Sequence, residues 1–352
     1  MCQGHAAETP VAAVPEDIGA FVGERVPLEP VERVSVTTLI DNSIDVLAAG
    51  ADGVVRPPIG LFGTLPSSVF VDGTVIDGPV AEHGFSALVE VTTAAGAVHR
   101  LIFDTGVTPD GMVENLRRMS LDPSAAEVVV CSHGHFDHVS GLDGLVRRLG
   151  GRVNLPIVIH PEFWSKRRVA LPGRDPWELP TPSRKALEGA GFEIYEREHP
   201  SFLFDRSVLI TGEVPRTTEF EKGMAPHQAL RPGGWEPDPL ILDDQALIVH
   251  VRGRGLLVLT GCGHAGIVNI TRYARALTGV EDVAAVMGGF HLTGPAFEPI
   301  IAPTVAALEA LSPRMIIPAH CSGWKAQATL ATRLPDAYVA NSIGTRIDLP
   351  AA

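Results

Sequence analysis

Four side chains that can bind a metal ion lie within six consecutive residues: His133, His135, Asp137 and His138. Neutral imidazole and carboxylate groups are ligands for zinc and similar divalent ions. On an extended loop, side chains at positions i and i+2 can face the same ion, which pairs His133 with His135. Asp137 and His138 then turn toward a second ion. A polar surface loop is the alternative, but the apolar run VVV just before the stretch indicates a buried strand.

Four histidines share one sequence context, because each follows a short apolar run: His133 after VVVCS, His264 after LLVLTGCG, His291 after VAAVMGGF and His320 after MIIPA. Buried strands of an α/β sheet end at a common edge, where such sheets place their sites. We therefore expect these side chains to converge in space. For His291, three roles stay open: metal binding, substrate contact or proton transfer, and structure.

Three side chains beside these motifs have competing roles. Asp104 begins a glycine turn, so it either caps that turn or orients a metal ligand of the histidine loop, and the two roles are compatible. Cys262 is either a thiolate that binds or bridges metal ions, or a buried thiol that only packs. Cys321 is expected to pack.

Four further residues are more weakly defined. His83, in AEHGFS, points either into a cleft or to a structural hydrogen bond. Arg216, in GEVPR, either binds an anionic group through its guanidinium or forms a surface salt bridge. His160 is expected to be structural, and His227 is expected to be exposed to solvent.

Two halves of the chain repeat one pattern, a hairpin followed by alternating helices and strands. The expected hairpins are FSALVEVTT with VHRLIFDTG, and QALIVHV with GLLVLTG across RGR. Helices are expected near 109–120, 140–149, 266–277 and 298–311. This pattern predicts an α/β sandwich, with two layers of sheet and helices outside.

No linker divides the chain, so residues 33–352 are predicted to form one domain after a loosely attached arm at residues 1–32. The Gly- and Pro-rich segment near 50–80 is expected to be an irregular insertion that could cover a cleft. The segment near 215–240 is also expected to be irregular, and a loop of that length is usually functional or mobile. Both insertions are predicted to shape the substrate pocket.

The composition excludes some classes of partner. A net charge of −13 over 352 residues repels phosphate backbones, so general binding to nucleic acid is not expected. A small anionic substrate remains compatible, because metal ions can make a cleft locally positive. Four cysteines are too few for a disulfide scaffold, and no apolar run reaches the length of a signal peptide or membrane helix. We expect a cytoplasmic protein that does not bind membranes, and its oligomeric state stays open.

The stretch SHGHFDHVSGL, preceded by LIFDTG, resembles the metallo-β-lactamase superfamily. The resemblance extends over most of residues 35–345. The motifs EHGFSALV, TGEVPR, DDQALIV, LTGCGHAGIVNI, GGFHL and PAHCSG are similar to a narrower branch, the dihydropterin–ribofuranosylaminobenzene 5'-phosphate synthase-like proteins. This resemblance implies an αββα sandwich of two mixed sheets flanked by helices, and a site for one or two metal ions.

The resemblance also assigns ligands. It implies that His133 and His135 bind the first metal ion, and that Asp137 and His138 bind the second. It matches His320 to the late histidine of the second site. Cys262 stands where many relatives carry a bridging aspartate and others a cysteine.

The sequence departs from the superfamily at one ligand, because no histidine of the P-G-H-T type precedes the QALIV strand. His264 is the main candidate for this missing first-site ligand, and Asp243 is a weaker candidate. The number of metal ions therefore stays open between one and two.

The predicted function is metal-dependent hydrolysis of an ester, lactone, amide or phosphoester bond in a small molecule. Asp137 is predicted to orient the attacking water besides binding metal, and His291 to protonate the leaving group. The histidine-rich ligand set favours zinc, with manganese or iron as alternatives. Two other functions stay open: a synthase or transferase on a phosphoribosyl- or pterin-like substrate, and a metal-containing protein that binds a ligand without turnover.

Overall fold

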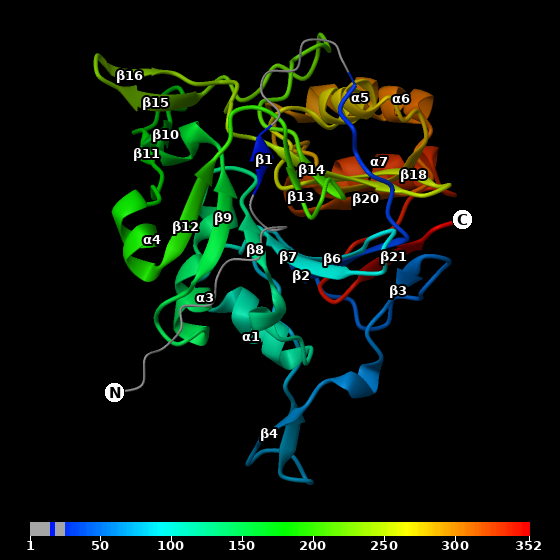
Figure 1. Cartoon of the computed structure of the whole chain (residues 1–352). Helices are drawn as coiled ribbons and strands as arrows, with labels where there is room; N and C mark the ends of the chain where they lie inside the picture. The colour runs from blue at the N-terminus through cyan, green and yellow to red at the C-terminus, as the bar shows by residue number, and fades with distance from the viewer. Residues whose placement is uncertain (1–14, 18–24) are drawn as a thin grey trace.

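Two large β-sheets lie face to face in the computed structural model, which describes residues 15–17 and 25–352. Helices cover the outer face of each sheet (Figure 1). Buried valine, leucine and isoleucine side chains from both sheets fill the space between them, and a separate apolar cluster lies under each layer of helices. The predicted αββα sandwich is thus confirmed.

The larger sheet has eight strands, and its middle is the hairpin predicted from FSALVEVTT and VHRLIFDTG. The strands that follow this hairpin run parallel to its second strand. In spatial order they are β12 (Phe192–Glu196), β9 (Leu155–Ile159), β8 (Val128–Val130), β7 (Val98–Phe103), β6 (Ser86–Thr92), β2 (Arg33–Ile40), β21 (Arg346–Pro350) and β3 (Val54–Val55).

The second sheet has seven strands and contains the other predicted hairpin. Its last three strands are parallel, so their carboxyl ends lie at one edge. In spatial order they are β1 (Glu16–Asp17), β13 (Ser201–Leu203), β14 (Val208–Ile210), β17 (Ala246–Val251), β18 (Gly255–Thr260), β19 (Val283–Gly289) and β20 (Ile316–Ala319).

The helices divide between the two outer faces. Those against the eight-stranded sheet are α1 (Gly111–Arg118), α3 (Leu142–Arg148) and α4 (Arg184–Ala190), and the single turn α2 (Phe136–Val139) precedes α3. Those against the seven-stranded sheet are α5 (Ile267–Thr278), α6 (Ile301–Leu311) and α7 (Trp324–Arg333). Short 3-10 helices cover Ile59–Leu61, Pro123–Ala125, Pro161–Trp164, Glu298–Ile300 and His320–Ser322. In the described part of the chain, no helix combines the length and apolarity that a membrane crossing requires.

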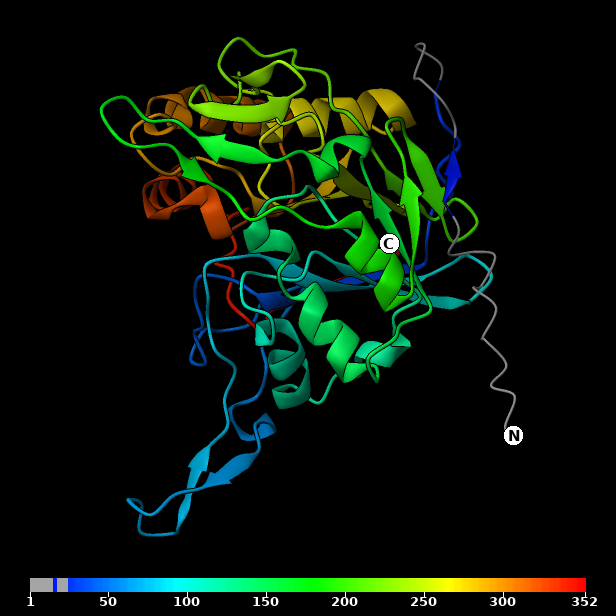
Figure 2. The same ribbon diagram turned by 90° about the vertical axis from the view of Figure 1, so that its left-hand side faces the viewer.

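Both segments that the sequence suggested were irregular contain strands. The first forms a hairpin of β4 (Thr64–Pro66) and β5 (Thr74–Ile76), which projects away from the sheets rather than covering a cleft (Figures 1 and 2). The second contributes β15 (His227–Arg231) and β16 (Gly234–Pro237) to a four-stranded sheet with β10 (Arg167–Val169) and β11 (Trp177–Glu178). The expectation of irregular structure was wrong. These strands are too short to show a clear alternation of apolar and polar residues in the sequence.

The N-terminal arm was predicted to be loosely attached, and this is wrong for its described residues. β1 pairs with β13, and the side chains of Leu28 and Val31 are buried in the apolar core. Residues 1–14 and 18–24 lie outside the described structure.

Candidate metal centre

The histidine loop leaves the buried strand β8 and enters α2 within a few residues. His135 has extended backbone dihedrals (φ −75°, ψ 145°) and immediately precedes α2, so Asp137 and His138 lie on the first helical turn. Gly134 is required here, because a Cβ at this position would lie 2.3 Å from the carbonyl oxygen of Phe163. The change from extended to helical backbone separates the two pairs of ligand candidates.

Metal-binding atoms from distant strand ends meet around Cys262. In each of three groups, the ligand atoms lie within 4.8 Å of one another, and Cys262 belongs to all three. The groups are Asp137, His138, Cys262 and His320; His133, Cys262 and His264; and Cys262, His291 and Cys321. The first group contains Asp137, His138 and His320, which the sequence assigned to the second ion. The second contains His133 and His264, but not His135, which was predicted to bind the first ion with His133 and whose ring centroid lies 4.5 Å from that of His133.

The four strand-end histidines lie in one continuous cluster of rings. The ring centroids of His133 and His264 are 4.9 Å apart, and those of His264 and His291 are 4.2 Å apart. His138 connects the remaining member, because its centroid lies 4.4 Å from that of His133 and 5.0 Å from that of His320. The predicted convergence is therefore observed, but it joins two sheets, because β8 belongs to the eight-stranded sheet and β18, β19 and β20 to the seven-stranded one.

Asp104 determines which nitrogen of His133 carries a proton. The Ser132 hydroxyl donates to Asp104 Oδ2 at 2.7 Å, and its oxygen lies 2.9 Å from His133 Nδ1. Because that hydroxyl hydrogen is already used, the Ser132 oxygen must accept a hydrogen bond from His133 Nδ1–H. The lone pair of His133 is then on Nε2, which is buried and has no hydrogen-bond partner.

Asp104 also orients His138, in this case by direct contact. Its Oδ2 lies 2.7 Å from His138 Nδ1, and His138 Nε2 lies 3.1 Å from Cys262 Sγ. Burial lowers the pKa of His138, but the Asp104 and Asp137 carboxylates outweigh it and raise that pKa to about 9. Asp104 therefore occupies the position predicted for a residue that orients ligands of the loop.

Asp137 lies between three histidines. Its Oδ2 is 3.2 Å from His320 Nε2, 3.9 Å from His138 Nε2 and 3.8 Å from His83 Nε2. Burial raises the pKa of Asp137, but His138 and His320 hold it far below its usual value. Asp137 is thus an ionised carboxylate inside the cluster.

Two strand-end histidines have left-handed backbone conformations. His291 has φ +44° and His320 has φ +45°, and such a conformation costs a non-glycine residue roughly 1–3 kcal/mol. His320 is held there because its backbone N–H donates to Asp41 Oδ1 at 2.8 Å, while its Nδ1 lies 3.3 Å from Asn42 Oδ1. This conformation leaves Nε2 of His320 facing Asp137.

The donor set fits a divalent metal ion. His133 Nε2 and both ring nitrogens of His264 are buried without a hydrogen-bond partner, which proteins generally avoid. Burial, and then the neighbouring histidines, lowers the pKa of both rings well below the usual range, so both are neutral. Neutral imidazoles with free lone pairs beside a thiol and a carboxylate are suitable ligands for zinc and related ions.

Asp243, the weaker candidate for a first-site ligand, is already fully engaged. Its carboxylate accepts from the backbone N–H of Gly134 at 2.8 Å and from both terminal nitrogens of Arg167, at 2.9 and 2.5 Å. Arg167 is 2% exposed and also donates to Asp238 at 3.0 Å. Asp243 thus belongs to a buried ion network behind the loop, and its proposed ligand role is not supported.

His227 was expected to be exposed, and this is wrong, because its side chain is completely buried. Its Nε2 lies 3.0 Å from His135 Nε2, and its Nδ1 lies 3.1 Å from the backbone oxygen of Asp238. The pairing of β15 with β10 sets His227 opposite Val169 and places it behind the histidine loop. The sequence HQALR has no apolar run that would have marked this strand, although His227 and Ala229 are both buried in it.

Arg216 does not form the surface salt bridge that was one of its two expected roles. Its guanidinium donates to the backbone oxygens of Val214 at 2.5 Å and Leu240 at 2.6 Å, so it braces the surrounding loop. His83 does lie beside the cluster, with its ring centroid 4.7 Å from that of His320 and its side chain 62% exposed.

The other two candidates that were expected to be structural have structural contacts. The Cys321 thiol is buried and donates to the backbone oxygen of Cys262 at 3.2 Å. His160 accepts the backbone N–H of Glu162 at 3.1 Å and so caps a 3-10 helix.

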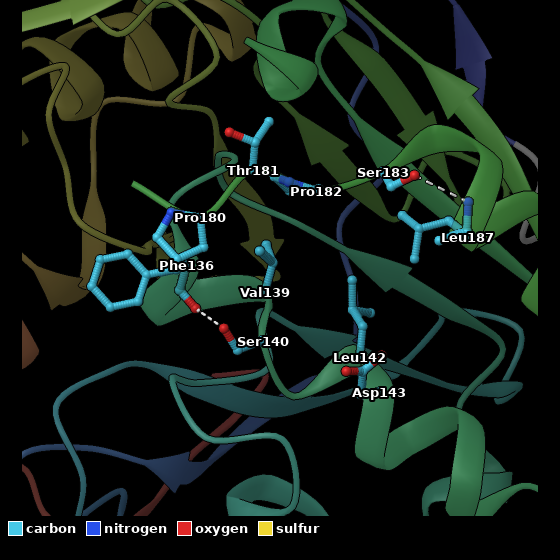
Figure 3. A pocket seen from close by; sticks show the side chains of 11 residues that line it. Phe136, Val139, Ser140, Leu142, Asp143, Pro180, Thr181, Pro182, Ser183 and Leu187 are labelled. Carbon is cyan, nitrogen blue, oxygen red and sulfur yellow. Dashed lines mark hydrogen bonds between the residues drawn. The ribbon is translucent and has the colours of Figure 1, made fainter. Parts of the chain in front are cut away.

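A narrow cavity of about 20 Å³ opens directly beside the cluster. His264 and His291 form part of its wall, Phe297 and Leu292 supply apolar surface, and the exposed Lys222 lies on its rim. The ring of Phe297 packs edge-on against His291, with centroids 4.4 Å apart. A larger pocket of about 250 Å³ lies between α2, α3 and α4 (Figure 3), but none of the candidate ligands lines it.

Comparison with known proteins identifies the family to which the sequence is similar. A sequence model of the Metallo-beta-lactamase superfamily matches residues 83–276, which is more than half of the chain. The 7,8-dihydropterin-6-methyl-4-(beta-D-ribofuranosyl)-aminobenzene-5'-phosphate synthase of Methanocaldococcus jannaschii is 28% identical over 257 residues, which cover 70% of this chain and 83% of the relative. An uncharacterized protein of the same archaeon is 30% identical over 268 residues, which cover 75% and 93%.

A solved structure has the same fold. Tm1679, described as a metal-dependent hydrolase of the beta-lactamase superfamily, superposes with a TM-score of 0.66 and 21% identity, covering 90% of this chain and 99% of that one. The resemblance noted from the sequence motifs is therefore confirmed, both for the fold and for the similarity to the archaeal synthase.

Proposed function

The chain belongs to the metallo-beta-lactamase superfamily, and on this premise we propose that it is a metal-dependent hydrolase. The proposed substrate is a small molecule with an ester, lactone, amide or phosphoester bond. The observation that carries the proposal is the convergence of imidazole, carboxylate and thiol groups around Cys262. Two histidines of this cluster, His264 and His291, line a cavity. Members of this superfamily are generally metal-dependent hydrolases, which supports the assignment.

The ligand set suggests which residues would hold metal. Asp137, His138, Cys262 and His320 would bind one ion, while His133 and His264 with the same thiol would bind a second. Imidazole and thiolate ligands favour zinc, with manganese or iron as alternatives. A bound divalent ion supplies a Lewis acid that lowers the pKa of water from about 15.7 toward 7 and polarises the scissile bond.

The protein's own groups supply proton transfer and orientation. Asp137 is ionised, so it can accept a hydrogen bond from the attacking water and orient it. His291 Nδ1 is buried without a partner at the cavity wall, so it can donate a proton to a leaving group. The ring of Phe297 packs edge-on against His291, and Lys222 offers a positive charge to an anionic substrate.

A synthase or transferase acting on a phosphoribosyl- or pterin-like substrate is the second candidate. It is favoured by the 28% identity to the archaeal synthase. In that reaction an acceptor group would take the place of the attacking water. The same cluster and cavity would serve it, so the two candidates differ in their products.

The test compares the metal-free protein with protein reloaded with zinc, manganese or iron, on panels of esters, lactones, amides and phosphoesters in ¹⁸O-labelled water. We expect turnover only with metal, and one ¹⁸O atom in the product. Asp137→Ala should abolish turnover, whereas His250→Gln, on β17 at the strand end remote from Gln245, should not. Unlabelled product would favour transfer, and equal turnover without metal would contradict both candidates. Ligand retention without turnover would indicate a binding protein.

A further inference from the structure

The β4–β5 hairpin carries apolar side chains that the described residues leave uncovered. At its tip, Val69 is 84% exposed, Phe70 is 56% exposed and Val71 is fully exposed. Leu65 on β4 and Ile76 on β5 are also exposed. A two-stranded hairpin alone is at best marginally stable in water, and a contiguous exposed apolar surface usually marks an interaction site. The hairpin is therefore a candidate interaction surface.

The base of the hairpin is fixed to the body of the protein. The Asp77 carboxylate is buried and accepts hydrogen bonds from Arg117 at 2.6 Å and from Arg118 at 2.9 Å, both on α1. The backbone N–H of Asp77 donates to the backbone oxygen of Gly63 at 2.8 Å, which closes the hairpin at its base. The apolar tip is thus presented away from the two sheets in a defined direction (Figures 1 and 2).

The composition of the hairpin selects the class of partner. Residues 60–80 contain two aspartates, Asp72 and Asp77, and no lysine or arginine. Because α1 neutralises Asp77, the tip has one net negative charge, at Asp72. Such a surface offers no cation to anionic lipid headgroups or to phosphate backbones. The partner that fits it is an apolar recess in a protein.

The chain itself contains such a recess, the pocket between α2, α3 and α4 (Figure 3). Val139, Leu142 and Leu187 line it and are at most 9% exposed, whereas the lining residues Thr181 and Ser183 are exposed. An apolar centre with a polar rim is the usual anatomy of a protein interface.

The size of the pocket matches the tip of the hairpin. Its volume is about 250 Å³, and an apolar cavity of about 150 Å³ holds a benzene ring, so the ring of Phe70 fits with room for a flanking valine. Figures 1 and 2 both place the hairpin apart from α3 and α4, so it does not fill the pocket of its own chain. The occupant that the structure offers is the hairpin of a second copy.

Exchange between two copies gives an interface of ordinary size. Each exposed valine, isoleucine or phenylalanine side chain offers on the order of 100 Å² of apolar surface, so one hairpin offers roughly 400–500 Å². Two hairpins and the two pocket walls that they cover would bury on the order of 1,600 Å², which is the size of a standard stable interface.

We propose that this chain forms a symmetric dimer in which the tip of each β4–β5 hairpin, with Phe70 at its centre, inserts into the pocket between α2, α3 and α4 of the other copy. Twofold symmetry makes the same contact twice and leaves neither hairpin free. Asp143 lines the pocket and has the same sign of charge as Asp72, so the contact depends on apolar burial rather than on ion pairs. This inference rests neither on metal binding nor on hydrolysis.

Sedimentation velocity of the full chain over a range of micromolar concentrations measures the dimer. We expect Phe70→Asp to raise the dissociation constant of the dimer by roughly 30-fold or more. Ala186→Lys, which adds a charged side chain at the pocket wall, should have a similar effect. Leu47→Asp and Ala328→Lys are matched controls at exposed positions elsewhere, and they should leave the dimer unchanged. Thermal unfolding checks that each variant is folded.

A crosslinking experiment identifies which surfaces touch. Val69→Cys and Ala186→Cys are made in separate chains, and each chain also carries Cys2→Ala to remove a cysteine outside the described residues. A short bifunctional maleimide should join position 69 of one chain to position 186 of the other when the two chains are mixed. Neither chain alone should crosslink to itself.

Four results would overturn the inference. The first is an unmodified chain that stays monomeric throughout the concentration range, and the second is a dimer that Phe70→Asp leaves intact. The third is a crosslink between two copies of Val69→Cys with none to position 186, because the hairpins would then pair with each other. The fourth is a monomeric chain that binds phosphatidylglycerol vesicles and loses this binding in Phe70→Asp, because the hairpin would then bind a membrane.

Discussion

Replacing Asp104 with asparagine would test how the ligand tautomers are set. The Asp104 carboxylate accepts three hydrogen bonds of 2.7 Å, from the Ser132 N–H, the Ser132 hydroxyl and His138 Nδ1. Its backbone is left-handed (φ +55°), a conformation that asparagine tolerates, so the substitution changes the acceptor without a backbone penalty. Any effect therefore comes from hydrogen bonding and charge.

The asparagine amide can satisfy only part of this network. If its oxygen keeps the Ser132 N–H, its NH₂ group faces two donors, the Ser132 hydroxyl and His138 Nδ1–H. Ser132 must then reverse its hydroxyl and donate to His133 Nδ1, which moves the His133 proton onto Nε2. His138 must also give up its Nδ1 proton and keep the one on Nε2. Both rings would present an N–H where a metal ion requires a lone pair.

The expected magnitude follows from the bonds lost. Hydrogen bonds to a charged group contribute roughly 1.5–3 kcal/mol each, and partners of metal ligands typically change metal affinity by roughly 10–100-fold. We therefore expect Asp104→Asn to weaken zinc binding by about 10–100-fold, which corresponds to about 1.4–2.7 kcal/mol. Competition with a chromophoric chelator measures this change.

Asp122→Asn is a matched control for this experiment. Asp122 accepts from the backbone N–H and hydroxyl of Ser124, at 2.9 and 2.8 Å, but it caps an exposed 3-10 helix. It should leave zinc affinity unchanged. Zinc affinity in Asp104→Asn equal to that of the unmodified protein would refute the reasoning, because the tautomers of His133 and His138 would then not depend on this carboxylate.

Three further changes have defined outcomes. Arg167→Met leaves two buried carboxylates without their cation, so the free energy of unfolding measured in urea should fall by roughly 3–5 kcal/mol. The control is Arg168→Met, which changes the half-buried neighbouring arginine. An equal loss of unfolding free energy in the two variants would contradict the prediction. Burial lowers the pKa of His138 in the metal-free protein, but the carboxylates beside it raise that pKa to about 9. Metal binding must displace the proton on His138, so metal affinity should fall as pH is lowered from 9. Calorimetry in different buffers should detect the released proton. Replacing residues 64–76 with a glycine–serine linker should leave metal content unchanged, because that hairpin pairs only with itself; a lower metal content would show that it supports the site.

The sequence predicted those parts of the site that lie at the ends of regular apolar strands. The runs before His133, His264, His291 and His320 are buried strands. Parallel pairing aligns the ends of β18, β19 and β20, and the face-to-face packing of the two sheets brings the end of β8 beside them. The two hairpins and most helices were predicted correctly because burial of one face makes apolar residues recur at regular intervals in the sequence. Helix α7 and strand β21 were missed.

The support behind the site could not be read from the sequence. Arg167 and His227 lie 60 positions apart on short strands, and only the pairing of β10 with β15 brings both to the back of the loop. Neither segment has a long apolar run, so each resembled a surface loop. Their burial depends on the ion network with Asp238 and Asp243, and that network exists only in the folded chain.

The most direct test of metal binding at the strand ends is an anomalous-difference map of zinc-loaded crystals, recorded at the zinc absorption edge. We expect a peak within about 2.0–2.3 Å of ligand atoms of Asp137, His138, Cys262 or His320, and a neighbouring peak at His133 and His264 if two ions bind. Zinc found only on the surface, with no peak among these side chains, would contradict the account.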